Sequence, residues 1–218
     1  IQAQLGEILR PVQLGYGTKG GCEIAVHATR AFLEVASNET RCLLKLDFKN
    51  AFNTIRRDRM LEKVKEVISE YHAYVSSTYL EPSILFCGDE TIPSNNGVQQ
   101  GDPLGPMLFC LVVDELAQSL DSPLNVWYLD DATLGGSPES VLENFTTVME
   151  KADELGLELN ASKCELLMLG GSEDARKKAA TLFRATAPEV RIVKPEDLEL
   201  LGAPLLGEAT TGALRKRI

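Results

Sequence analysis

Two adjacent aspartates between two short apolar segments constrain the fold of this chain more than any other feature. The stretch "VWYLDDATLGG" (126–136) holds Asp130 and Asp131 at its centre. Each flanking segment has the length of a short strand, so the pattern predicts a β-hairpin with both aspartates at its tip. Adjacent carboxylates repel each other unless a cation or an exposed turn relieves the repulsion. An exposed turn and a metal site therefore both remain open as interpretations at this point.

A third aspartate follows another apolar segment, much earlier in the chain. Asp47 stands near the end of the predicted buried strand 42–48, within "LLKLDF". If this strand neighbours the hairpin in one sheet, three carboxylates meet at a single sheet edge. Three carboxylates without a local base form a hard-oxygen site suited to Mg²⁺. Two such ions about 3.5–4 Å apart would clamp the attacking and leaving oxygens of a phosphoryl transfer.

The distribution of charge supports a role for metal in this region. The chain has a net charge of -10, which argues against casual binding to nucleic acid. Between Glu66 and Glu150 there is no Lys or Arg, although this span contains Asp102, Asp130 and Asp131. A region of this kind cannot hold phosphate with basic side chains, so it would need a divalent cation.

Length and cysteine usage indicate the class of protein. The 218 residues, 44% of them hydrophobic, suit one domain or a domain with an appendage. No segment has the length of a membrane span, and no secretory signal is evident, so no membrane partner is expected. The five cysteines are scattered without zinc-ligand spacing, which predicts free thiols in a reduced intracellular compartment, either nucleus or cytoplasm. The chain begins with Ile, so we expect a piece of a longer polypeptide.

The apolar periodicity predicts a mixture of helices and strands without regular βαβ alternation. We therefore expect an α+β fold in which an antiparallel sheet is backed by helices. Helices are predicted within the segments 22–38, 56–75, 107–120, 137–160 and 172–185. Strands are predicted at 42–48, 125–129, 132–136 and 163–169, in a hairpin over 82–94 turning at Gly88-Asp89, and in two short strands within 191–205 followed by the start of another helix.

Local signals place several of the helix ends. Pro103 and Pro106 suit the first turn of the helix that follows the turn-rich loop 95–106. Ser137 is a candidate N-cap, and Gly156 lies near the end of the same helix.

Two other groups of residues are interpreted as structural. The basic cluster formed by Arg56, Arg57 and Arg59 is most simply a solvated helix face. Cys22 and His27 lie on an early predicted helix and show no pattern of a functional site.

Five segments resemble, in order, the palm motifs of reverse transcriptases. They are Asp47-x-x-x-Ala51-Phe52, "NGVQQGDPLGP", "YLDD", "GLELNASKCE" and "LELLGAPL". The resemblance is strongest to the non-LTR retrotransposon (LINE-like) and group II intron branch. The upstream segment "LRPVQLGYGTKGGCEIAVHATR" resembles the late-fingers segment of that branch. The resemblance spans nearly the whole chain. It implies a polymerase palm with part of the fingers and no thumb: late fingers over about 1–40, the palm catalytic core over about 41–170, and the end of the palm over about 171–218, with a primer-grip-like hairpin and the start of the thumb connection.

The resemblance also implies the residues of the catalytic centre. Asp47 would bind two Mg²⁺ ions, or Mn²⁺ in their place, with help from the carbonyl of Phe48. Asp130 would be the second bridging ligand and Asp131 the more peripheral one. Lys163 in "NASKCE" matches a lysine near the leaving pyrophosphate, where it would donate a proton or neutralise charge. The alternative for Lys163 is a solvated lysine before a strand.

A further set of residues matches the nucleotide site of the family. Phe52 stands where the family keeps an aromatic ring that blocks a ribose 2′-OH, and ordinary core packing is the alternative. Backbone N–H groups near Asn50 and Ala51 would cradle the triphosphate. Gln100 and Gly101 match the loop under the incoming nucleotide, because Gly permits close backbone approach and Gln can hydrogen-bond sugar or base. A simple helix-entry turn is the alternative for that loop.

Contacts to nucleic acid are implied at three places. Lys45 and Lys49 flank Asp47 on the same face of the strand and would meet a nucleotide phosphate or a nucleic-acid backbone. Tyr128 would lie against the primer end. The segment "LLGAPL" resembles the primer-grip hairpin, with a plain β-hairpin as the alternative. The residues of this hairpin that the resemblance places at nucleic acid are Leu200, Leu201 and Gly202.

The resemblance implies an RNA-directed DNA polymerase of a retroelement, which extends a DNA primer on an RNA template with dNTPs. Fingers, thumb and an endonuclease domain of the same polyprotein would flank it. One alternative is the palm of a viral RNA-dependent RNA polymerase, a group that usually has Gly before its aspartate pair and a second aspartate in its first motif. The other is a catalytically inactive, polymerase-like remnant that binds RNA or protein.

Overall fold

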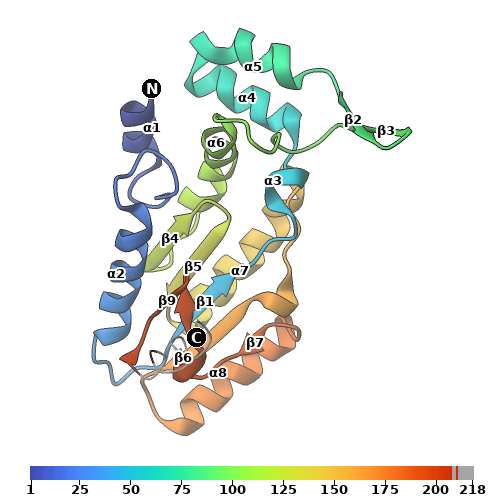
Figure 1. Ribbon diagram of the computed structural model, residues 1–218. Coiled ribbons are helices and arrows are strands. Elements are labelled where there is room, and N and C mark those ends of the chain that lie inside the picture. The colour runs from blue at the N-terminus through green and yellow to red at the C-terminus, as the bar shows by residue number, and fades with distance from the viewer. Residues whose placement is uncertain (208–209, 211–218) are drawn as a thin grey trace.

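A five-stranded sheet forms the centre of the molecule (Figure 1), whose computed structural model describes residues 1–207 and 210. The strand order is β4-β5-β1-β6-β7. The first four strands pair antiparallel, as the sequence predicted, whereas β7 pairs in parallel with β6. The bounds are β1 Arg41–Leu46, β4 Leu124–Tyr128, β5 Asp131–Gly136, β6 Glu165–Leu169 and β7 Arg191–Ile192.

Eight α-helices are present in the described part of the chain. Their bounds are α1 Gln2–Leu9, α2 Gly21–Glu34, α3 Ala51–Thr54, α4 Arg57–Val67, α5 His72–Tyr79, α6 Gly105–Gln118, α7 Pro138–Ala152 and α8 Glu173–Thr186. Short 3₁₀ turns occupy Ser69–Tyr71, Asp153–Leu155, Ala161–Lys163 and Pro195–Asp197. The predicted segment 56–75 is therefore two helices, α4 and α5, separated by a 3₁₀ turn.

The predicted helix ends are largely confirmed. The hydroxyl of Ser137 accepts a hydrogen bond from the N–H of Ser140 at 3.2 Å, as expected of an N-cap. Gly156 has a φ of +78° and ends the turn that follows α7. Pro106 lies in the first turn of α6, whereas Pro103 precedes that helix.

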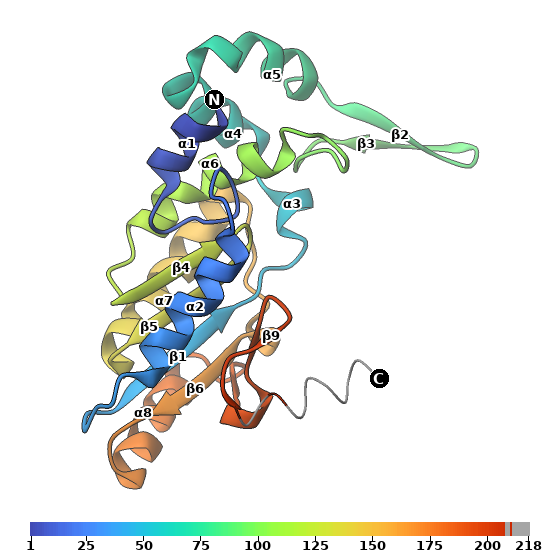
Figure 2. The same ribbon diagram turned by 60° about the vertical axis from the view of Figure 1, so that its left-hand side comes forward.

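Alternating residues of the central strands bury two separate apolar clusters. Leu44 and Leu46 of β1 face the larger cluster, which is built with residues of α4, α6, α7 and α8. Leu43 and Leu167 face the opposite side, where α2 packs together with the small hairpin β8 Glu199–Leu200 and β9 Ala203–Pro204. Figures 1 and 2 show these layers on the two sides of the sheet. The sheet is thus covered on both faces, with helices dominating one of them.

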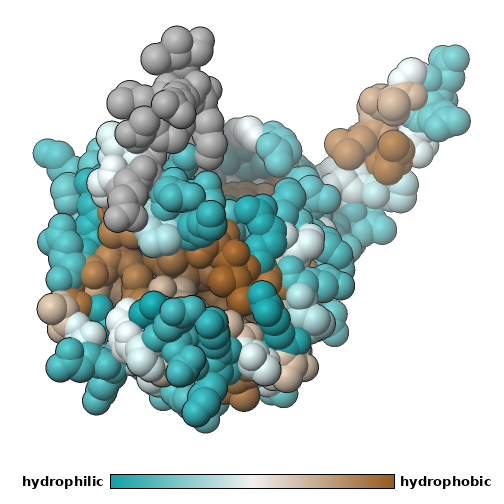
Figure 3. All heavy atoms as spheres, turned by 90° about the horizontal axis from the view of Figure 1, so that it is seen from below, coloured by the Kyte–Doolittle hydropathy of each residue, from teal (hydrophilic) through white to brown (hydrophobic). Residues whose placement is uncertain are grey.

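The hairpin of β2 (Ser83–Cys87) and β3 (Glu90–Ser94) projects away from the body of the molecule (Figures 1–3). Its turn contains Gly88 with a φ of +62°, where the sequence predicted it. The hairpin carries exposed apolar side chains, which are brown in Figure 3. They are Ile84, Leu85, Phe86 and Ile92.

Two predictions from composition concern the chain as a whole. The five cysteines are free thiols in the structure. Within residues 1–207 and 210, no helix is both long and apolar enough to cross a membrane. The predicted helix after Leu205 and the thumb connection fall mainly on residues 208–209 and 211–218, which lie outside the described residues.

Candidate active site

The sheet brings the three aspartates to one of its ends. Leu46 pairs with Ala132 at the end of the β1–β5 ladder, so Asp47 directly follows β1 at the sheet end where Asp131 begins β5. Tyr128 pairs with Asp131 across β4 and β5, which leaves Leu129 and Asp130 as the two-residue connection. The two strands are therefore neighbours, as the sequence analysis required.

The carboxylates of Asp47, Asp130 and Asp131 make this end of the sheet electrostatically negative, with Lys45 as an opposing charge. Desolvation raises the pKa of Asp130, and the nearby charge of Asp47 raises it further. Desolvation likewise raises the pKa of Asp131, as do the charges of Asp130 and Asp47, while Lys45 opposes the rise. A nearby cation would favour the ionised forms of Asp130 and Asp131 and so oppose the rise in their pKa values.

The donor chemistry at this sheet end fits a divalent cation, although the carboxylates do not form a closed ligand shell. In the part of the chain that the structure describes, no three His, Cys, Asp or Glu side chains are grouped closely enough to hold a metal ion. Carboxylate oxygens are the ligands that Mg²⁺ prefers, and a cation would favour the ionised forms of Asp130 and Asp131, whose pKa values are raised by desolvation first and by neighbouring carboxylates second. The chemistry of these donors suits the predicted ions, whereas the predicted gathering of three carboxylates at metal-binding distance is not found among the described residues.

The backbone around Asp47 is anchored by a turn from a distant part of the chain. The N–H of Asn160 donates to the carbonyl of Asp47 at 2.8 Å, and the N–H of Asp47 donates to the Sγ of Cys164 at 3.4 Å. Cys164 is buried, and sequence reasoning assigned it no part in the site. The predicted Lys163 is exposed and lies in the 3₁₀ turn between these two contacts. The structure therefore brings Lys163 to the neighbourhood of Asp47.

Aromatic packing fixes the segment that follows Asp47. The ring of Phe48 stacks on Trp127 of β4, with ring centroids 6.0 Å apart. Trp127 is fully buried, and its indole N–H donates to the side chain of Asn125 at 2.9 Å. The carbonyl predicted to assist metal binding therefore belongs to a residue that is anchored in the core.

The two lysines that flank Asp47 both pair with glutamates. Lys45 contacts Glu165 at 2.8 Å, and Lys49 contacts Glu158 at 2.5 Å. An incoming phosphate would have to compete with these carboxylates. Contacts of Lys45 and Lys49 with phosphate remain predictions.

Three of the residues predicted for nucleotide binding line one cavity of about 300 Å³. The lining residues are Phe52, Val98, Gln99, Gln100, Gly101, Asp102, Gly105 and Pro106. The amide of Gln100 donates to the side-chain oxygen of Asn53 at 3.2 Å, which ties the loop to α3. Gly101 has a φ of +89°, a conformation that favours glycine. Loop and helix thus both line the cavity.

The start of α3 turns sharply away from the aspartates. Asn50 adopts a left-handed conformation with a φ of +47°, and its carbonyl accepts from the N–H of Asn53 at 2.8 Å. Ala51 is buried beside Asn50, and Phe52 is half-buried. The backbone of Asn50 and Ala51, which is predicted to bind the triphosphate, therefore connects Asp47 to Phe52 at the cavity.

Arg57 corrects one expectation from the sequence. It was expected on a solvated face, yet only 6% of it is exposed. Its guanidinium donates to the carbonyls of Ser94 at 2.6 Å and Gly97 at 2.9 Å, and lies over the ring of Tyr79 at 5.3 Å. A buried arginine becomes tolerable here because backbone carbonyls and an aromatic face replace its water. The pattern of charged residues in the sequence does not indicate that distant carbonyls and an aromatic ring will surround Arg57.

Arg57 contacts the start of the loop between β3 and α6, and Tyr79 contacts the part of this loop that lies closer to α6. Its hydroxyl donates to the carboxylate of Asp102 and accepts from the N–H of Gln99 at 3.1 Å. Burial and the hydrogen bond with Asp102 raise the pKa of Tyr79 to about 12. Arg57 and Tyr79 together fix the loop that carries Gln100 and Gly101, a role that sequence reasoning missed.

The predicted hairpin near the C-terminus is present. Leu201 and Gly202 form its turn with φ values of +50° and +75°. Leu200 is buried in the cluster beneath α2, and a guanidinium N–H of Arg30 in α2 donates to the carbonyl of Pro204 at 2.7 Å. Contact of this hairpin, or of Tyr128, with a primer remains a prediction.

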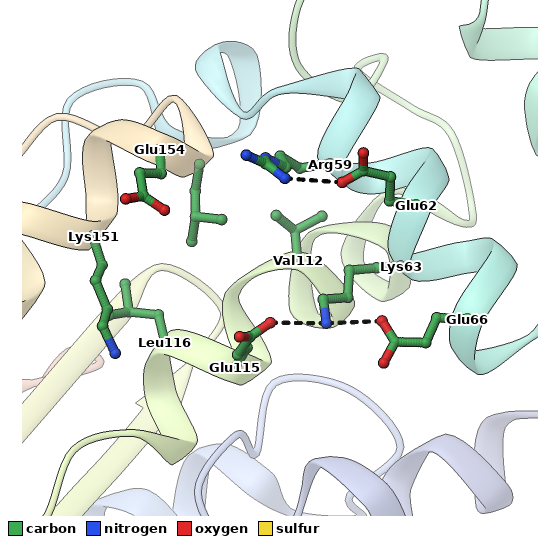
Figure 4. A pocket seen from close by; sticks show the side chains of 10 residues that line it. Arg59, Glu62, Lys63, Glu66, Val112, Glu115, Leu116, Lys151 and Glu154 are labelled. Atoms are coloured by element: carbon green, nitrogen blue, oxygen red, sulfur yellow. Dashed lines mark hydrogen bonds and ion pairs between the residues drawn. The ribbon is translucent and has the colours of Figure 1, made fainter.

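A second cavity, of about 370 Å³, lies among α4, α6 and α7 (Figure 4). Arg59 pairs with Glu62 at 3.0 Å, and Lys63 bridges Glu66 at 3.0 Å and Glu115 at 2.9 Å. No residue that the sequence analysis placed in the catalytic or nucleotide site lines this cavity. Its acids and bases largely neutralise one another.

Comparisons with known proteins show the family of this chain. Residues 2–205 match the family model described as "Reverse transcriptase (RNA-dependent DNA polymerase)". The chain is similar to the retrotransposable element SLACS 132 kDa protein of Trypanosoma brucei gambiense, with 30% identity over 67% of this chain and 14% of that protein. It is also similar to the Pol polyprotein of the type-2 retrotransposable element R2DM of Drosophila melanogaster, with 26% identity over 80% of this chain and 18% of that protein. The chain thus spans less than a fifth of these relatives.

A solved structure shares the fold. The telomerase from Candida albicans, in a complex with a fragment of telomeric RNA, superimposes with a TM-score of 0.51 and 14% identity. The match covers 80% of this chain and 35% of the telomerase chain. This likeness supports the palm-like arrangement of a sheet backed by helices. By the family match over nearly its full length, the chain belongs to the reverse transcriptase (RNA-dependent DNA polymerase) family, and its curated relatives assign it to the non-LTR retrotransposon branch.

Proposed function

We propose that this chain is the catalytic palm of an RNA-directed DNA polymerase from a non-LTR retroelement. It extends a DNA primer on an RNA template with dNTPs and releases pyrophosphate. The observation that carries the proposal is the pairing of β1 with β5, which brings Asp47 to the sheet end that holds Asp130 and Asp131, in a chain of the reverse transcriptase family.

The aspartates hold the ions on which the reaction depends. Asp47 and Asp130 would hold the ions, with Asp131 more peripheral and the carbonyl of Phe48 assisting. Two Mg²⁺ ions, or Mn²⁺, supply Lewis-acid activation of the primer hydroxyl and neutralise charge on the reacting phosphate when bound. The raised pKa values of Asp130 and Asp131 support this role because a cation relieves the repulsion that causes part of the rise.

Other residues orient the nucleotide and the leaving group. Phe52 excludes a ribose 2′-OH at the wall of the cavity that Gln100 and Gly101 also line. Backbone N–H groups near Asn50 and Ala51, with the side chain of Lys49, meet the triphosphate. The exposed Lys163 delivers a proton or a positive charge to the pyrophosphate as it leaves.

The duplex is recognised by its shape and backbone rather than its base sequence. Tyr128 and the turn at Leu201 and Gly202 contact the primer strand. Residues of about 1–40 form the late fingers, 41–170 the catalytic core and 171–218 the link to a thumb. Further fingers, a thumb and an endonuclease domain belong to the same polyprotein, in keeping with relatives of which this chain spans 14–18%.

Replacing Asp130 with Asn tests the proposal. Mg²⁺-dependent incorporation of dNTPs on an RNA template, measured in a polypeptide that extends primers, is expected to fall more than about 100-fold, because a direct ligand matters more than the groups that support it. Asp174→Asn, at an exposed position of α8, is the control and is expected to retain incorporation. Undiminished incorporation by Asp130→Asn would refute the assignment.

The two alternative functions predict different results in measurements of nucleotide incorporation and of ligand binding. A viral-type RNA polymerase would incorporate rNTPs in preference to dNTPs. An inactive remnant would show neither Mg²⁺ nor dNTP binding in calorimetry. The family match and the retrotransposon relatives favour the retroelement polymerase over the viral one.

A further inference from the structure

The side chain of Gln13 forms a pair of hydrogen bonds with the backbone of Leu129, the residue between Tyr128 and Asp130. Its Nε2 donates to the carbonyl of Leu129 at 3.0 Å, and its Oε1 accepts from the N–H of Leu129 at 2.9 Å. Gln13 is fully buried. The amide group therefore acts as a strand partner for Leu129, one of the two residues that the hairpin leaves unpaired.

Leu129 needs such support because of its backbone conformation. Its φ is +57°, a left-handed value that a leucine rarely adopts. A leucine at this position of a short connection would relax toward other conformations unless its surroundings fix it. The paired bonds from Gln13 engage both backbone polar groups of Leu129 in this conformation.

Gln13 is itself held in register with the strand that leads to the turn. The N–H of Trp127 donates to the carbonyl of Val12, and the N–H of Leu14 donates to the carbonyl of Trp127, both at 2.8 Å. These bonds make a parallel bridge between Gln13 and Trp127. Segment 12–14 therefore runs beside the end of β4 and aims the amide of Gln13 at the turn.

The next residue along this segment completes the support. The N–H of Gly15 donates to the Oε1 of Gln13 at 2.9 Å. A Cβ atom on Gly15 would lie 2.4 Å from the nitrogen of Leu129, so only glycine allows this approach. The acceptor oxygen of Gln13 is thus shared between Gly15 and Leu129, which fixes the orientation of the amide.

We propose that Gln13 is a positioning residue that selects the left-handed conformation of Leu129 and thereby sets the Asp130–Asp131 turn for metal binding. The consequence for metal rests on the function proposed above. A ligand that binds only one conformation of a turn loses apparent affinity in proportion to the fraction of molecules that adopt it. Without Gln13, that fraction falls before any ion arrives.

Substitutions of Gln13 separate positioning from packing. Gln13→Leu and Gln13→Met fill the space but supply no hydrogen bond. Gln13→Glu is the rescue variant: burial keeps its carboxyl neutral, and the protonated group offers one donor and one acceptor in place of the amide. Asn144→Leu is the matched control, because Asn144 is a buried amide in α7 with hydrogen bonds to Asp121 and Ser140 and no contact with the turn.

The first readout is hydrogen exchange at the N–H of Leu129 in the 218-residue chain without metal. Exchange is expected to accelerate by about tenfold or more in Gln13→Leu and Gln13→Met, the factor that one hydrogen bond typically provides. It is expected to stay within about threefold of the wild type in Gln13→Glu and in Asn144→Leu, after correction for global stability. Unchanged exchange in Gln13→Leu overturns the proposal.

The second readout is Mn²⁺ affinity, measured by calorimetry on the same variants. Gln13→Leu is expected to bind Mn²⁺ about tenfold more weakly than the wild type, with Asn144→Leu unchanged. Equal affinity in Gln13→Leu and the wild type overturns the proposed link to metal. If the wild-type chain binds no Mn²⁺ that Asp130→Asn abolishes, the proposed function fails instead, and the exchange of Leu129 still decides the role of Gln13.

Discussion

Phe52 stacks on Phe109, with ring centroids 4.3 Å apart and ring planes 8° apart. Phe109 is fully buried in α6, so the core of the protein fixes the orientation of a ring that lines the candidate nucleotide cavity. The two interpretations of Phe52, packing and exclusion of a ribose hydroxyl, are therefore compatible. An aromatic side chain that blocks a substituent needs such a rigid backing.

Removing the ring of Phe52 is expected to relax the choice of sugar. In a polypeptide that extends primers, Phe52→Ala should lower the preference for dNTPs over rNTPs by about tenfold or more, because a missing steric wall costs selectivity of that order. Phe52→Tyr keeps the stack and is expected to keep the preference. If Phe52→Ala unfolds more easily but retains its selectivity in kcat/KM, the ring serves packing alone.

Arg57 is expected to stabilise the loop that it contacts. Arg57→Met leaves the carbonyls of Ser94 and Gly97 without their charged donor and should lower the free energy of unfolding by about 2–4 kcal/mol. Urea denaturation measures the loss. Arg59→Met, on the exposed face of the same helix, is the control and should change stability by less than about 0.5 kcal/mol. Equal effects of the two substitutions would show that the buried contacts contribute nothing.

The stability of the protein should depend on pH through Asp114. Burial raises the pKa of this carboxyl, although a hydrogen bond from Gln118 and the charge of Lys63 oppose the rise. The folded state therefore binds the proton more tightly than the unfolded state does, and stability is lost as pH rises through the folded pKa. Asp114→Asn should accordingly stabilise the protein near pH 7, with a gain that shrinks toward about pH 4.

Urea denaturation at several pH values checks this expectation for Asp114. The same substitution at Asp89, on the exposed turn between β2 and β3, is the control. A gain at Asp114 that is independent of pH would mean that ionisation is not its cause.

Gly15 should tolerate no side chain. In Gly15→Ala the new Cβ would meet the nitrogen of Leu129 at 2.4 Å and its side chain at 2.8 Å, so backbone must move. A loss of about 1–3 kcal/mol in the free energy of unfolding is expected from such overpacking. Gly105→Ala is the comparison, because its Cβ would meet Val98 at an ordinary 3.7 Å and alanine favours the helix. A Gly15→Ala protein as stable as the Gly105→Ala protein would contradict the close approach.

Local patterns in the sequence determined most of the elements and part of the site. The strand before Asp47, the hairpin around Asp130 and Asp131 and the N-cap at Ser137 all follow from apolar periodicity or turn chemistry within a few residues. Such signals depend on neighbours along the chain, so they are readable before folding. The parallel pairing of β7 had no local signal, because strand direction depends on where the chain returns after α8.

The tertiary structure decided which distant groups meet. The sequence placed three aspartates at strand ends, but only the pairing of β1 with β5 brings Asp47 to the same end of the sheet as Asp131. Arg57 looked like a surface charge until the loop at Ser94 and Gly97 covered it. The hydrogen bonds between Gln13 and Leu129 join residues 116 positions apart. Contacts of this kind exist only when the whole core has packed, because burial is what makes an amide or guanidinium require one specific partner.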